Sequence, residues 1–91
     1  MSEYKKKICI IDYRTGNIGS VSNLLNKLNI NFCVSNENND FTNCSHFILP
    51  GVGSFSAAMK SMTKYVDIKF LEKEIFEKKK PILGICVGMQ L

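Results

Sequence analysis

Short apolar runs that alternate with longer amphipathic segments constrain the fold of this chain more than any other feature. Four runs have the length and the β-branched content of strands, namely residues 7–12 (KICIID), 30–35 (INFCVS), 46–50 (HFILP) and 81–85 (PILGI). Strands and helices that alternate in this way form right-handed βαβ units. The pattern predicts an α/β fold with a doubly wound parallel sheet and helices on both faces.

Three segments between these runs have helical spacing. They are residues 17–29, with Val21, Leu24, Leu25 and Leu28 on one face; a short helix after GVGS, with Phe55, Met59 and Met62; and a charged helix over residues 66–79, with Ile68, Leu71 and Ile75. We expect these apolar faces to pack into the core. The polar stretch 36–43 (NENNDFTN) is expected to be a loop, Pro50 to end the third strand, and the unbroken apolar run of the last strand to be buried.

Composition excludes several classes of protein. The chain has 91 residues, of which 45% are hydrophobic and 22% charged, which is typical of one small globular domain. The net charge of +4 comes largely from Lys5–Lys7 and Lys78–Lys80, which we interpret as solvated lysines with no aromatic residues between them. No apolar run approaches the length of a membrane span or signal peptide. We therefore expect a cytoplasmic protein with no nucleic-acid or membrane partner.

The four cysteines show no metal-binding spacing. They are separated by 24, 11 and 42 residues, without a C-x-x-C pair and with His46 as the only histidine. We therefore predict no metal site. Cys9, Cys33 and Cys44 are interpreted as small apolar residues of the core.

Cys86 stands between two glycines at the end of the last predicted strand. The segment 84–88 (GICVG) has the form G-x-C-x-G, with Gly84 and Gly88 two residues on either side of the cysteine. Chemistry in open parallel sheets lies at the carboxyl ends of strands, and a nucleophile elbow places its reactive residue at a strand-to-helix turn. A helix starting at Cys86 would direct free N–H groups at the sulfur and favour the thiolate. Cys86 is therefore the candidate nucleophile.

Three motifs together resemble those of the class I glutamine amidotransferases. They are ICIIDYRTGNIGSV at residues 8–21, ILPGVGSFSAAM at 48–59 and PILGICVGMQL at 81–91. Within this family they are most similar to the glutaminase subunits that supply ammonia to a synthase (cyclase) partner in histidine biosynthesis. The resemblance implies a flavodoxin-like sheet and glutamine as the substrate, with no cofactor.

The resemblance also assigns roles to individual residues. Cys86 would attack the side-chain carboxamide of glutamine and form a thioester. The oxyanion hole would consist of the backbone N–H of Val87 and that of Val52, with Gly51 beside it. Further residues would bind substrate or contact the partner; these are Gly53 and Gln90 for substrate, and Gly16 and Asn17 for the partner interface.

Two features depart from the family pattern. The family activates its cysteine with a histidine and a glutamate in an H-x-E segment about a hundred residues downstream, and the only histidine here, His46, precedes a strand. We therefore interpret residues 1–91 as the N-terminal part of a single amidotransferase domain, truncated after the nucleophile elbow and inactive alone. The second departure is Arg14, at a position that is usually small in the family.

Two other interpretations remain open at this stage. Relatives with the same motifs supply ammonia for other products, including amidino groups on bacterial surface sugars, and Arg14 leaves that acceptor open. A flavodoxin-like module that binds phosphate or flavin through TGNIGS (residues 15–20) is the alternative from a different class. It lacks the strict G-x-G-x-x-G pattern and leaves the cysteine elbow unexplained.

Overall fold

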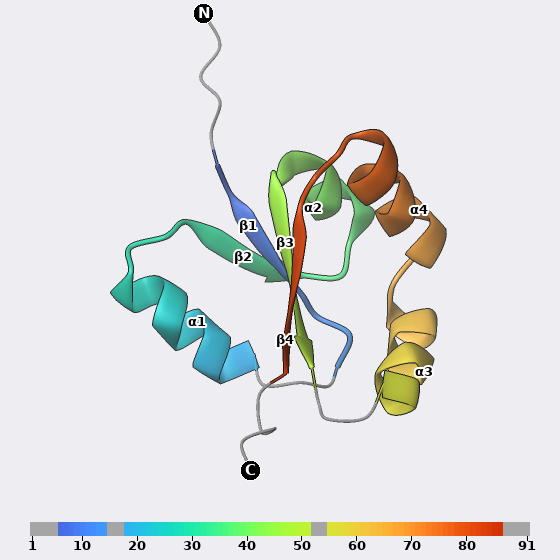
Figure 1. Ribbon diagram of the computed structural model, residues 1–91, viewed down its shortest axis with the longest axis horizontal. Helices are drawn as coiled ribbons and strands as arrows, with labels where there is room; N and C mark the ends of the chain where they lie inside the picture. Colours follow the sequence, from blue (N-terminus) through green and yellow to red (C-terminus); the bar gives the residue numbers. More distant parts are fainter. Residues whose placement is uncertain (1–5, 15–17, 52–54, 87–91) are drawn as a thin grey trace, which may run out of the picture.

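Four parallel strands form one sheet at the centre of the molecule (Figure 1). The computed structural model describes residues 6–14, 18–51 and 55–86, with the backbone alone at 55–59, 85 and 86. The spatial order is β2-β1-β3-β4, in which the strands are β1 (Ile8–Ile11), β2 (Phe32–Ser35), β3 (His46–Gly51) and β4 (Ile82–Cys86). All three pairings are parallel. This order is the flavodoxin-like one, and it confirms the predicted doubly wound fold.

Helices cover both faces of the sheet. Helix α1 (Ile18–Lys27) lies on one face, while the other carries α2 (Asn38–Asn43), α3 (Phe55–Tyr65) and α4 (Ile68–Glu72) (Figure 1). One π-helical turn, η1 (Lys73–Glu77), continues α4 without a break. Asp67 begins α4 as its N-cap and accepts a hydrogen bond of 3.2 Å from the Phe70 N–H, as capping residues do.

The core consists of two apolar layers that follow the alternation of side chains along the strands. On the α1 face, Ile10 and Ile48 pack against Val21 and Leu25. On the opposite face the buried set is larger and contains Cys9, Ile11, Tyr13, Phe41, Cys44, Phe47, Met62, Val66 and Leu71. Successive residues of a strand point to opposite faces, which is why neighbours such as Cys9 and Ile10 belong to different layers.

The expectation of a loop over residues 36–43 was wrong, because Asn38–Asn43 form helix α2. Phe41 is fully buried and its ring meets that of Phe47 edge to face, with centroids 5.7 Å apart. The Ser35 hydroxyl also donates to the Asp40 carboxylate at 2.5 Å. One aromatic anchor and this local bond outweigh the low helix propensity of an Asn-rich segment.

Pro50 does not end the third strand, which continues to Gly51. Pairing of β3 with β1 extends only to Ile48, whereas pairing with β4 includes Pro50 opposite Ile85. Proline lacks an N–H and is tolerated where a strand is paired on one side. The strand therefore runs past its proline to the edge of the sheet.

Two expectations of burial were also wrong. Leu24 and Leu28 are 52% and 57% exposed, because α1 packs on the sheet through Val21 and Leu25, with Ile18 partly buried beside them. Strand β4 is not buried, since Leu83 is 59% exposed. In the described part of the chain, β4 is an edge strand. Leu83 is paired with Ile48 of β3, which belongs to the apolar layer on the α1 face.

Candidate active site

The candidate nucleophile lies at the carboxyl edge of the sheet. Strand β4 ends at Cys86, and the register pairs Cys86 with Gly51, the last residue of β3. Adjacent strands lie about 4.8 Å apart, so the backbones at the ends of the second and third motifs are direct neighbours. The structure thus places Cys86 at the carboxyl end of a strand, as expected. The turn after it lies outside the described residues, and its role as a nucleophile stays a prediction.

The other residues assigned by resemblance to the site lie outside the described part of the chain. They are Val52, Gly53, Val87, Gln90, Gly16 and Asn17. Their roles stay predictions. The structure shows the ends of β1, β3 and β4, after which the loops that contain these residues begin.

Tyr13 connects two of these strand ends, and sequence reasoning missed it. The residue lies just after β1 and is fully buried, and its hydroxyl donates a hydrogen bond to the carbonyl of Pro50. Pro50 precedes Gly51, so the bond ties the first loop to the start of the second. A tyrosine directly after an apolar strand was the available signal, but its partner is 37 residues away in sequence.

Arg14 is held at the protein surface. Its φ of 72° lies in the left-handed region, and its N–H donates to the Asp12 carboxylate at 3.0 Å. An Asx turn of this kind helps a non-glycine residue to adopt that conformation. The guanidinium lies 5.3 Å from the centre of the Tyr65 ring, within the range of a cation–π contact. Arg14 thus joins the first loop to the end of α3.

His46 lies at the opposite edge from Cys86. It is the first residue of β3, and its Nδ1 lies 2.7 Å from the Ser45 hydroxyl. Five steps of about 3.3 Å each lead from His46 to Gly51, which is roughly 16 Å along the strand. A general base must reach its partner within hydrogen-bonding distance. The structure therefore confirms that His46 is badly placed to activate Cys86.

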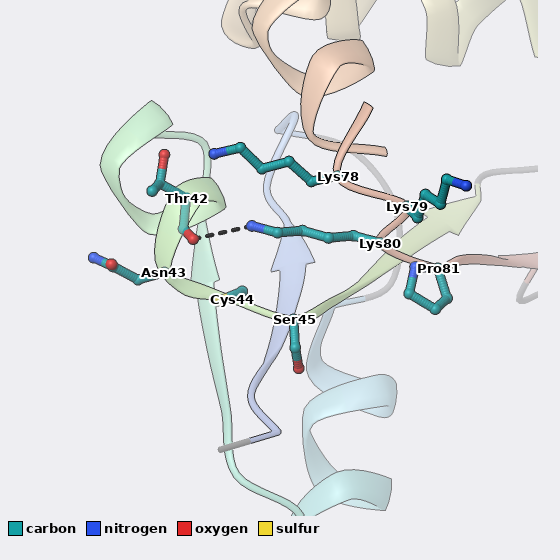
Figure 2. A pocket seen from close by; sticks show the side chains of 8 residues that line it. All are labelled: Thr42, Asn43, Cys44, Ser45, Lys78, Lys79, Lys80 and Pro81. Carbon is teal, nitrogen blue, oxygen red and sulfur yellow. Dashed lines mark hydrogen bonds between the residues drawn. The ribbon is translucent and has the colours of Figure 1, made fainter. Parts of the chain in front are cut away.

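The amino edge of the sheet contains a pocket of about 310 Å³ between the end of α2 and the segment before β4 (Figure 2). Lys80 crosses it, and its ammonium donates to the Phe41 and Thr42 carbonyls at 2.9 Å each and to Glu74. Lys78 also bonds Glu74, at 3.0 Å. The expectation that Lys78–Lys80 are solvated was therefore wrong for Lys80, whereas the Lys78 side chain is 54% exposed.

Glu74 forms the centre of this charge cluster. Its side chain is only 3% exposed and bonds both lysines. Burial alone raises the pKa of Glu74, but the hydrogen bonds and positive charges of Lys80 and Lys78 outweigh it and leave the pKa below its usual value. The ammonium of Lys80 is fully occupied by these partners, so the pocket offers a structural ion pair instead of an anion site.

Three cysteines that the spacing treated as unrelated come together beneath α2. The sulfur atoms of Cys9, Cys33 and Cys44 all lie within 4.8 Å of one another, and those of Cys33 and Cys44 are 3.6 Å apart. Burial, followed by the neighbouring thiols, raises the pKa of Cys44 to about 11 and that of Cys9 further. The raised pKa values keep Cys9 and Cys44 protonated at neutral pH, which lowers their reactivity as nucleophiles.

Comparison with known proteins identifies the class to which this fold and strand-end cysteine belong. Residues 9–91 match the family described as Glutamine amidotransferase class-I. The chain therefore belongs to the class I glutamine amidotransferases.

Several relatives of the chain are subunits of the same enzyme. The chain is 45% identical over 85 residues to imidazole glycerol phosphate synthase subunit HisH 1 of Campylobacter jejuni, an alignment that covers 92% of this chain and 42% of that protein. It is 39% identical over 84 residues to subunit HisH 2 of Methanococcus maripaludis, with the same coverage. The corresponding subunit HisH 2 of Vibrio vulnificus is 43% identical over 86 residues, covering 93% and 40%. The chain thus spans about two fifths of the length of these relatives.

Proposed function

We propose that this chain is the nucleophile-bearing part of the glutaminase subunit of an imidazole glycerol phosphate synthase, and that it supplies ammonia to a synthase partner in histidine biosynthesis. The observation that carries the proposal is the position of Cys86, the last residue of β4, beside Gly51 at the carboxyl edge of the sheet. The names of the relatives and their identity of 37–45% support the choice of synthase.

In the proposed reaction the Cys86 sulfur attacks the side-chain carbonyl carbon of glutamine. The C–N bond then breaks, ammonia leaves with an added proton, and a γ-glutamyl thioester remains. Water hydrolyses the thioester, which releases glutamate and restores the thiol. The charge that develops on the carbonyl oxygen is stabilised by the backbone N–H groups of Val87 and Val52.

The remaining residues of the proposed site bind the substrate or contact the partner subunit. Gly51 and Gly53 let the backbone around Val52 approach the substrate, and Gln90 contacts it. Gly16 and Asn17 contact the synthase subunit in the segment that follows Tyr13 and Arg14. Because His46 is at the wrong edge, it is not the general base in this proposal, and residues 1–91 by themselves are expected to be inactive.

The location proposed for the complete protein is the cytoplasm. Among the residues that the structure describes, no helix combines the length and the apolar character needed to cross a membrane. The four thiols would remain reduced in that compartment.

The test uses the full-length protein that contains this chain, assembled with its synthase subunit. Glutamate release is measured for the parent, for Cys86→Ser and for Asn39→Ser, an exposed position on α2. We expect Cys86→Ser to lower turnover at least about 1000-fold with partner binding intact, and Asn39→Ser to match the parent. Near-parental activity in Cys86→Ser would exclude Cys86 as the nucleophile.

The same assay tests the role of Cys86 in glutamine hydrolysis separately from the identity of the synthase partner. If glutamine hydrolysis depends on Cys86 but the protein forms no complex with the histidine-pathway synthase, the ammonia acceptor is different. Amidino-sugar synthesis is then the alternative to examine.

A further inference from the structure

The sheet register brings together three cysteines that the proposed glutaminase reaction does not use. Cys9 and Cys33 are each the second residue of their strand, and β1 and β2 pair with these two residues opposite each other. Paired residues of neighbouring parallel strands point to the same face. Cys44 follows directly after α2, where its N–H donates to the Asp40 carbonyl at 3.1 Å, and it completes the group.

The spacing of the three sulfurs is that of ligands around one ion. Bonds of about 2.3 Å from an ion to thiolate sulfurs separate those sulfurs by about 3.8 to 4.0 Å in tetrahedral or trigonal planar geometry, and by less in the trigonal pyramid of an ion with a lone pair. The observed separations are 3.6 Å for Cys33 and Cys44, and no more than 4.8 Å for any pair. Small rotations about the side-chain bonds therefore close the site without movement of the sheet.

The surroundings determine which ion fits. Cys9 and Cys44 are 0% and 2% exposed, and the cluster lies among Phe41, Phe47 and Leu71. Three thiolates around Zn²⁺ or Cu⁺ carry a net negative charge, which is costly to bury in an apolar layer. A trivalent ion with three thiolates is neutral and avoids this cost.

We propose that Cys9, Cys33 and Cys44 form a three-sulfur site for a trivalent thiophilic ion of the arsenic(III) class, a function beyond the glutaminase reaction. Arsenous acid, As(OH)₃, exchanges its three hydroxyls for three thiols. Three As–O bonds break, three As–S bonds form, and each thiol proton leaves with a hydroxyl as water. The exchange involves no change of oxidation state and no net charge.

The pocket at the amino edge gives this site a path to solvent. Cys44 is one of the residues that line it, together with Thr42 and Ser45 at the ends of α2 and β3 (Figure 2). Cys33 is itself half-buried. Because Cys44 is only 2% exposed, arsenous acid reaches its sulfur from the pocket through a small local movement at the end of α2.

The experiment titrates the full protein with arsenite in a thiol-free reducing buffer. Bound arsenic is measured by elemental analysis after desalting. The free cysteines are counted by maleimide labelling with mass spectrometry, in parallel on arsenite-treated and untreated protein, under mildly denaturing conditions in which all four thiols of the untreated protein label. We expect one arsenic per chain, with Cys9, Cys33 and Cys44 protected from labelling. Cys86→Ser should bind equally well, so the outcome is independent of the glutaminase proposal.

Single substitutions test the three-sulfur geometry. Cys33→Ala removes a half-buried ligand and should weaken arsenite binding about 100-fold, because the third bond forms at high effective concentration. Cys44→Ala should do the same. Zn²⁺ serves as the second probe and should bind more weakly than arsenite. Arsenic binding that survives Cys33→Ala unchanged, protection of only two cysteines, or tighter binding of Zn²⁺ would each overturn the proposal.

Discussion

The two edges of the sheet are held in different ways. At the amino edge, Lys80 and Lys78 surround the buried Glu74, and the Lys80 ammonium also bonds the carbonyls at the end of α2. At the carboxyl edge, Gly51 and Cys86 are the last residues of their strands, and the buried Tyr13 hydroxyl holds the carbonyl of Pro50.

This difference indicates that the amino edge contributes mainly to stability and the carboxyl edge mainly to turnover. Side chains at the amino edge are fixed by one another, so changes there should affect stability. Strand ends at the carboxyl edge offer backbone groups to the loops that follow, where ligands bind in open parallel sheets. Changes at that edge should affect turnover. The following predictions test whether the two effects separate.

After Cys86→Ser, the largest expected effect on turnover comes from a substitution at the carboxyl edge. Val52→Pro removes the backbone N–H proposed as an oxyanion donor, and turnover of the full-length protein should fall about 100- to 1000-fold. Val52→Ala keeps the N–H and should retain most activity. Both are measured as glutamate release in the assembled complex. Full turnover in a folded Val52→Pro variant would contradict the role of this residue.

The second effect is on the amino edge. Glu74→Gln removes the charge that Lys80 and Lys78 neutralise, and should lower the free energy of unfolding by about 2 to 3 kcal/mol. The exposed neighbour Glu72→Gln should change it by less than about 0.5 kcal/mol. Urea unfolding measures both. Turnover below the unfolding transition should stay at the parental level, and a large loss would break the separation of the two edges.

A smaller effect, on both stability and turnover, is expected at Tyr13. Tyr13→Phe leaves the buried Pro50 carbonyl without its hydroxyl partner and should cost about 1 kcal/mol of stability. The variant should also lower turnover severalfold, because Pro50 precedes the proposed oxyanion loop. Tyr65→Phe, at a 40% exposed position, is the matched control. If Tyr13→Phe changes stability but not turnover, the tyrosine has a purely structural role.

The smallest effect concerns pH. The pKa of Glu74 is lowered in the folded protein, so its contribution to stability is present above the unfolded-state pKa of about 4.3 and is lost as pH falls through the lower folded-state pKa. Urea unfolding between pH 5 and pH 3 should therefore show a steeper loss for the parent than for Glu74→Gln. Equal slopes would show that other carboxylates carry the acid sensitivity.

The sequence alone indicated the alternation of strands and helices, apart from α2, and the position of the candidate nucleophile at the end of β4. Apolar runs of period two and helical stripes depend on local geometry, so β1, β3, α1 and the end of β4 could be placed from them. Cys86 was found because its two glycines are neighbours along the chain. The same local reasoning placed His46 before β3, far from the cysteine.

Only the tertiary structure decided which side chains meet across the sheet. Helix α2 depends on Phe41 packing against Phe47, and the Tyr13 hydroxyl finds a carbonyl 37 residues away. Cys9, Cys33 and Cys44 come together through strand register and the end of α2, neither of which leaves a fixed spacing in the sequence. Contacts of this kind depend on how layers pack in three dimensions, and periodicity along one segment carries no information about the register between two of them.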